Sequence, residues 1–358
     1  MDGSAGADSS IAHGWEAYHR LELDGAQRAF RDAIGKDADA FEGHYGLART
    51  LIRMRREEEA RAEVERCLEL APERFESQAV AGLFYFLVDA LDEALTALQK
   101  AIKLAPDAVE SQVVLAQVQA DRGAFDDAEA ALERARELID ALPDGTEQRR
   151  ERARLLHAET YVALTAGRED EARAKAEEAL ELADANPHAV CLANTNLGLM
   201  AARHKRWDEA VFYLEAALEL NPAFYRARSA LGRVHLVAGR PAEAADALEI
   251  ALEQMPHPEA HTVMAYASAL SKTGRREEAV AQYRRALTLH PRWLERVYAW
   301  WQIVWQSRWG RIAVIALGVV ALLLWLALGG PSPQAVTLVL LVVVVLALQR
   351  SMTGKKLR

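Results

Sequence analysis

The sequence predicts an all-α protein built as a solenoid of paired helices. Small residues recur at near-regular intervals through most of the 358 residues, and the apolar residues around them repeat with the helical period of about 3.6. Prolines stand where helices would have to end, because proline cannot continue a helix. Residues 191–224 contain one complete unit. In it Ala210 and Leu214 fall on one helical face, and Pro222 follows the second helix.

An alanine marks each of eight predicted units. It returns every 34 residues in the first four units and at intervals of 34 to 44 residues afterwards. The marker alanines are Ala26, Ala60, Ala94, Ala128, Ala172, Ala210, Ala244 and Ala279. In four units the preceding helix carries a glycine where we expect two helices to approach closely. These glycines are Gly14, Gly82, Gly198 and Gly232, and Ala48, Ala116 and Ala267 take the same place in three other units.

This pattern resembles the tetratricopeptide repeat, a helix–turn–helix unit of 34 residues. The resemblance implies a right-handed superhelical solenoid of about eight helix pairs. It also implies that the first helices of successive units line a concave groove, which binds a peptide or a partner helix.

The chain order predicts several segments. Residues 1–10 are small and polar and are expected to be disordered, with no secretory signal peptide. Units 1–4 occupy residues 11–142, and units 5–8 occupy residues 143–291 after an insertion rich in charge, Pro and Gly. Residues 292–311 hold five of the eight tryptophans and predict a helix that both caps the solenoid and lies at a membrane interface.

Two apolar segments follow, at residues 312–330 and 335–349, and we interpret them as a hairpin of two transmembrane helices. The second segment is short for a span and is also compatible with a re-entrant segment. Arg308 and Arg311 precede the hairpin and the basic tail 350–358 follows it, whereas the turn between the two segments carries no charge. The positive-inside rule therefore places the repeats and the C-terminus in the cytoplasm.

The rich content of Ala, Arg and Leu indicates a bacterial source, which makes the inner membrane the expected location of a multi-pass protein. A eukaryotic source would instead point to the outer membrane of an organelle. The formal net charge is −9, and an acidic repeat domain argues against nucleic acid as a partner. The two cysteines lie in different units, so no disulfide framework is expected.

Catalytic chemistry is not predicted. The sequence carries no Gly-rich phosphate loop, no nucleophile elbow and no zinc-spaced set of Cys and His residues. Clusters of carboxylates fall at the starts of predicted second helices, where the helix dipole favours them. We therefore expect no enzyme activity, no cofactor, no metal and no small-molecule substrate.

The predicted groove is the candidate site for a protein or peptide partner. Its first four units present acidic residues, whereas the later units present mainly basic ones, which suits an acidic ligand or a C-terminal carboxylate. The alternative is that part of these charges form solvated helix faces. The expected partner-binding residues are Arg154, His157, Tyr161, Asn196, Arg203, Arg226 and Arg233.

These observations predict an adaptor or scaffold that is anchored in the lipid bilayer by its C-terminal hairpin and binds a protein partner in its groove. The alternative is a structural subunit of a membrane complex for secretion, transport or envelope assembly. In that case the transmembrane hairpin would make the important contacts and the repeats would act as a spacer.

Overall fold

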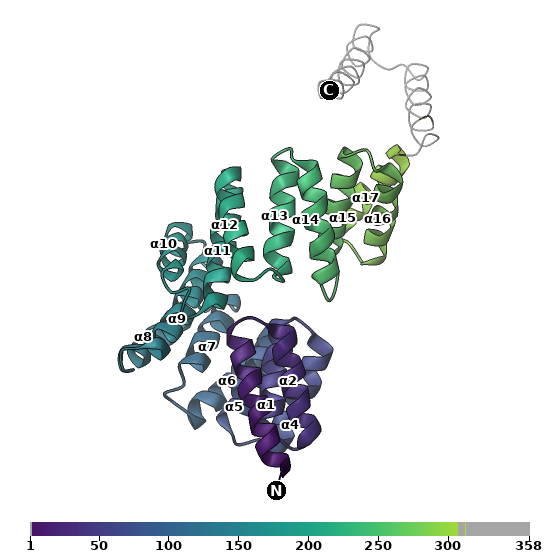
Figure 1. Ribbon diagram of the computed structural model, residues 1–358. Helices are drawn as coiled ribbons and strands as arrows, with labels where there is room; N and C mark the ends of the chain where they lie inside the picture. Colours follow the sequence, from purple (N-terminus) through teal and green to yellow (C-terminus); the bar gives the residue numbers. More distant parts are fainter. Residues whose placement is uncertain (1, 307–311, 313–358) are drawn as a thin grey trace. The chain divides into compact units, whose positions relative to one another are not determined.

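The structure is a computed structural model that describes residues 2–306 and 312, and throughout this part of the chain the regular structure is helical (Figure 1). The chain divides into two compact units, residues 1–279 and 280–358, which are described separately. The helices are α1 (Asp2–His19), α2 (Leu23–Lys36), α3 (Phe41–Arg53), α4 (Glu57–Leu70), α5 (Phe75–Leu87), α6 (Leu91–Leu104), α7 (Val109–Asp121), α8 (Phe125–Asp140), α9 (Thr146–Thr165), α10 (Glu169–Leu180), α11 (Pro187–Arg203), α12 (Trp207–Leu220), α13 (Tyr225–Val237), α14 (Pro241–Gln254), α15 (Ala260–Lys272), α16 (Arg276–Thr288) and α17 (Trp293–Gln306).

In the first compact unit the helices pack as consecutive pairs, from α1 with α2 to α13 with α14. The first helix of each pair also contacts the first helix of the next pair, from α1 with α3 to α13 with α15. The packing continues across the predicted insertion, because α9 contacts both α7 and α8. The prediction of an all-α solenoid of helix pairs is therefore confirmed, and its right-handed sense stays a prediction.

The turn between the two helices of every pair contains one residue with positive φ, five residues before the marker alanine. Its φ lies between 59° and 88°. The residues are Leu21, Arg55, Asp89, Gly123, Gly167, Lys205, Gly239 and Gly274. The next residue donates its N–H to a carbonyl five residues back, as Arg56 does to Leu51 at 3.0 Å. This Schellman-type ending of the first helix occurs eight times at the predicted spacing.

The predicted close approach of the two helices within a pair is confirmed at all four glycines. A β-carbon added at any of them would lie only 2.5 to 2.7 Å from the large side chain four residues after the marker alanine. The contacts are Gly14 with Phe30, Gly82 with Leu98, Gly198 with Leu214, and Gly232 with Leu248. The marker alanines are fully buried at the same crossings, so the core of each pair depends on small residues.

The N-terminus differs from the prediction, because residues 2–10 are helical and α1 begins at Asp2. Ala7 and Ser10 are buried. The Ser10 hydroxyl donates to Asp32 of α2 at 2.6 Å, and the Lys36 ammonium donates to Ser10 at 2.9 Å. Small residues that look disordered in the sequence thus belong to α1, where Ser10 contacts the C-terminal part of α2.

The C-terminal segments are described only in part. Within the predicted segment 292–311 the structure describes helix α17 as far as Gln306, with Trp293, Trp300 and Trp301 exposed on it, and residues 307–311 lie outside the described part of the chain. Across residues 2–306 and 312, no helix is long and apolar enough to cross a bilayer. The predicted transmembrane helices 312–330 and 335–349, apart from Ile312, and the tail 350–358 lie outside the described residues.

The crossing at Gly232 gives a test of this packing. We expect Gly232→Ala to lower the free energy of unfolding by about 1 to 3 kcal/mol, because the new β-carbon would overlap Leu248 and lie 3.2 Å from the carbonyl oxygen of Ala244. Urea denaturation followed by circular dichroism measures the change.

The matched control is Gly35→Ala in α2, where a β-carbon meets nothing within 4 Å. We expect this variant to keep or gain stability, because alanine has the higher helix propensity. Equal losses in both variants would contradict the role of the close approach.

Candidate partner-binding cavity

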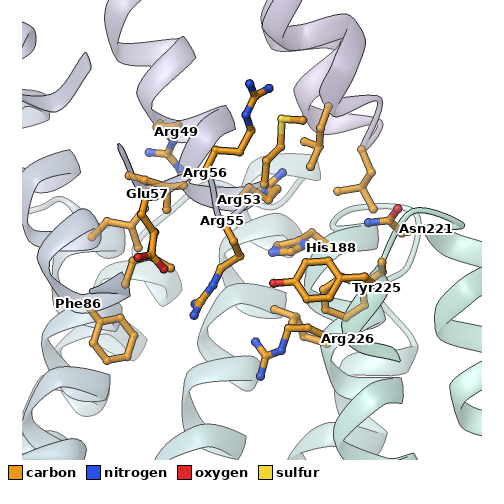
Figure 2. Close-up of a pocket in the computed structure, with 18 of the residues that line it drawn as sticks. Arg49, Arg53, Arg55, Arg56, Glu57, Phe86, His188, Asn221, Tyr225 and Arg226 are labelled. Atoms are coloured by element: carbon orange, nitrogen blue, oxygen red, sulfur yellow. The ribbon is translucent and has the colours of Figure 1, made fainter. Parts of the chain in front are cut away.

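A cavity of about 1520 Å³ lies within the first compact unit. Side chains of α3, α5, α7, α9, α11 and α13 line it, together with the starts of α2 and α4, the α1–α2 and α3–α4 turns and the loops before α13 and α15. Figure 2 shows side chains from the α3–α4 turn facing those at the start of α13. The cavity is larger than the 300 to 1,000 Å³ typical of small-ligand pockets, and this size suits an extended peptide.

The cavity contains five of the seven predicted partner-binding residues: Arg154, His157, Tyr161, Asn196 and Arg226. They come from α9, α11 and α13, the first helices of three successive pairs, so the repeat brings together residues that are far apart in the sequence.

The other two predicted residues, Arg203 and Arg233, do not line the cavity. Only the N-terminal parts of α11 and α13 reach it, whereas both arginines lie further along these helices. The Arg203 side chain is 66% exposed and pairs with Glu169 at 3.0 Å. Both arginines lie on helices that reach the cavity, but the sequence could not give how far the cavity extends along each helix.

Sequence reasoning missed the arginines of the second unit, Arg49, Arg53 and Arg55, which also line the cavity. Arg49 and Arg53 are four residues apart in the predicted first helix of the second unit and therefore share one helical face, a spacing that could have identified them. Arg55 lies in the α3–α4 turn, outside any helical pattern. Its only sequence signal is that four other units have glycine at this turn position.

A buried ion pair joins α3 to α7 across the cavity. The Arg49 guanidinium donates to both carboxylate oxygens of Glu110, with distances of 2.5 and 2.6 Å. It also donates to the Tyr45 hydroxyl at 2.8 Å. Arg49 is only 8% exposed, so this bidentate geometry provides the compensation that a buried charge requires.

The charge of Glu110 is maintained by its neighbours. Burial raises the pKa of the Glu110 carboxyl, but Arg49 and Arg154 outweigh burial and bring this pKa down to about 2. Arg154 lies 3.7 Å from Glu110 and 3.0 Å from Glu151. Both Arg49 and Arg154 are therefore compensated by carboxylates and are less available to a ligand than an arginine without such a partner.

Two histidines in the cavity are held in the neutral form. Burial and the positive charge of Arg226 lower the pKa of His157 to about 4. Burial, Arg53 and other cations lower the pKa of His188 well below its usual value. The Nδ1 atoms of both rings are buried and have no hydrogen-bond partner within the described part of the chain. This wall of the cavity is therefore electropositive through its arginines, with two polar ring atoms left unsatisfied.

The opposite rim of the cavity is acidic. Asp24 lies in the first turn of α2, and Glu57, Glu58 and Glu59 lie in the first turn of α4, where the helix dipole favours negative charge. Only Glu59 of these four forms an ion pair within the described residues. The cavity thus has an acidic rim and a basic inner wall.

Sequence models described as the tetratricopeptide repeat match residues 11–74, 90–145, 201–265 and 260–292. Together they cover more than half of the chain. The chain is a tetratricopeptide-repeat protein. No curated protein sequence matches it.

Solved structures share the tetratricopeptide-repeat fold. The Cut9–Hcn1 hetero-tetramer of APC/C has a TM-score of 0.58 at 15% identity, over 84% of this chain and 55% of that chain. The present chain thus spans about half the length of that relative. The human IFIT1 dimer with m7Gppp-AAAA has a TM-score of 0.58 at 20% identity, over 87% and 73% of the two chains. Pseudomonas aeruginosa pilF has a TM-score of 0.50 at 19% identity, over 62% and 94%. At these identities the likeness supports the fold alone.

The Arg49–Glu110 pair should contribute strongly to the stability of these tetratricopeptide repeats. We expect Glu110→Gln to lower the free energy of unfolding by about 3 kcal/mol, because it leaves the buried Arg49 charge without its counter-ion. Urea denaturation at neutral pH measures the loss.

The control is Asp39→Asn, which removes the exposed partner of Arg66. Because exposed ion pairs contribute little, this variant should keep the denaturation midpoint of the native protein. A native midpoint for Glu110→Gln would show that the buried pair is not important for stability.

Proposed function

We propose that this protein is a non-catalytic adaptor that holds a protein partner at a membrane by binding an acidic peptide segment of that partner in the cavity. The observation that carries the proposal is the convergence of five predicted groove residues with Arg53 and Arg55 on one cavity of peptide size. Tetratricopeptide repeats form scaffolds suited to protein interactions, and the family assignment therefore supports this class of function.

The inner wall of the cavity favours an acidic ligand. Arg226 is exposed and has no carboxylate within 4 Å among the described residues. Its guanidinium can therefore donate to a carboxylate without breaking an existing ion pair. The Phe86 and Tyr161 rings, which meet edge to face with centroids 6.0 Å apart, add an aromatic surface for the apolar part of a peptide.

The membrane part of the proposal rests on the sequence and on α17. Residues 312–330 and 335–349 are apolar, and basic residues stand before and after them. The exposed tryptophans of α17 precede this segment directly, and tryptophan is enriched at membrane interfaces. We propose a multi-pass anchor in a bacterial inner membrane, with the repeats and the C-terminus on the cytoplasmic side.

Copurification from detergent extracts, followed by mass spectrometry, tests the adaptor function. We expect a soluble partner to be recovered with the native protein and to fall by about tenfold or more with Arg226→Glu, because charge reversal removes a charge-assisted contact and repels an acidic ligand.

The matched control is Arg203→Glu, which reverses an exposed charge outside the cavity and should leave the partner bound. If instead the same membrane proteins copurify with all three proteins and no soluble partner depends on Arg226, the adaptor function is wrong. The membrane segments would then carry the interaction.

Membrane extraction tests the anchor. We expect the native protein to stay in the membrane pellet after washes with high salt and alkaline carbonate. These washes release peripheral proteins but not proteins that are anchored by membrane-spanning segments. Replacing Leu322 and Leu323 by arginine should release it, because an arginine costs about 3 kcal/mol at the centre of a spanning helix. Recovery of the native protein in the carbonate supernatant would contradict the anchor.

A further inference from the structure

Arg55 occupies a backbone conformation that is unfavourable for its side chain. It has φ of 59° in the α3–α4 turn, in the left-handed region that glycine adopts at the same position of four other units. Residues that keep such strain are concentrated at binding and active sites. Arg55 lines the cavity, and so do Leu21 and Asp89, the equivalent turn residues of the first and third units. Lys205, the equivalent residue of the sixth unit, does not.

The Arg55 side chain faces the opposite wall of the cavity. In Figure 2 the guanidinium groups of Arg55 and Arg226 point into the same space, between the rings of Phe86 and Tyr225. Arg55 is close enough to Tyr225 to oppose the rise in the pKa of this phenol that burial causes. The second unit thus contributes a cation to the space at the start of α13.

Neither of these two arginines has a carboxylate within 4 Å among the residues that the structure describes, although Glu57 lies on the same turn as Arg55. Arg49, Arg154 and Arg56 each have one. Figure 2 also shows the ring of His188 beside Tyr225, and its buried Nδ1 atom has no hydrogen-bond partner in the described part of the chain. The space therefore has two uncompensated guanidinium groups and an unsatisfied polar ring atom.

We propose that Arg55 and Arg226 form an anion-binding subsite that takes a carboxylate of a peptide, with the aromatic rings of Phe86 and Tyr225 on either side. This inference rests on the proposed function and specifies its ligand. Two guanidinium groups offer planar forks of donors that match a carboxylate, and the surrounding cavity accommodates the peptide chain on both sides. The carboxylate can come from an Asp or Glu side chain or from a chain end.

Arg55→Gly is the discriminating variant. Glycine removes the strain of the turn, so the variant should keep or raise the melting temperature, by about 2 °C, while it weakens carboxylate binding by about tenfold. The matched control is Lys205→Gly, which relieves the same backbone conformation outside the cavity. It should raise the melting temperature similarly and bind as the native protein does.

Binding is measured by fluorescence anisotropy on the full chain in detergent with two labelled decapeptides. One alternates Glu and Leu and has an amidated C-terminus, and the other has Gln in place of Glu and a free C-terminal carboxylate. Binding of the first peptide identifies an acidic side chain as the ligand, and binding of the second identifies a chain end. The subsite is wrong if neither peptide binds, or if Arg55→Gly binds both as tightly as the native protein.

The copurification experiment separates this inference from the proposed function. If the soluble partner is lost with Arg226→Glu but retained with Arg55→Gly, the adaptor function stands and the subsite with Arg55 fails. If the partner is retained with both variants, the proposed function itself fails. If the partner is lost with both variants but retained with Lys205→Gly, the result supports both the adaptor function and the subsite.

Discussion

The structure depends on how closely the two helices of each pair approach. In four pairs a glycine of the first helix lies against the large side chain four residues after the marker alanine, and an added β-carbon would not fit there. The close approach of the two helices fixes the geometry of each pair. The regular spacing of the pairs then determines which residues of the first helices line the same cavity. The shape of the cavity thus depends on the small residues at the helix crossings, although these residues do not line it.

The turns between the two helices of each pair recur as regularly as the helix crossings, but some of them contribute side chains to the cavity. Every pair ends its first helix with a left-handed residue, and glycine is the residue with the least strain there. The first three units and the sixth use larger residues instead, and in the first three these side chains reach the cavity. The repeat pattern therefore leaves one position per unit where a binding residue can be added at a moderate cost in stability, without disturbing the helix crossing.

Periodicity made most of the fold predictable from the sequence. The marker alanines and the crossing glycines are constrained by packing, and in the structure they lie at the helix crossings that the repeat predicts. The helical start of α1 could not be predicted in this way, because it depends on contacts of Ser10 with Asp32 and Lys36 that leave no periodic signal. The sequence predicted part of the lining of the cavity. Arg226 followed from its helical position, whereas Arg55 in its turn did not, and Arg203 and Arg233 were included because the depth of the cavity is a tertiary property.

The Arg49–Glu110 pair connects the second unit to the fourth and passes over the third. In repeat proteins each unit normally interacts only with its neighbours, so that opening can begin anywhere and spread one unit at a time. An ion pair that skips a unit limits this freedom, because the second and fourth units cannot separate without breaking the contact between Arg49 and Glu110. Units two to four should therefore open together in hydrogen exchange, and the wall of the cavity that carries Arg53 and Arg55 belongs to this block.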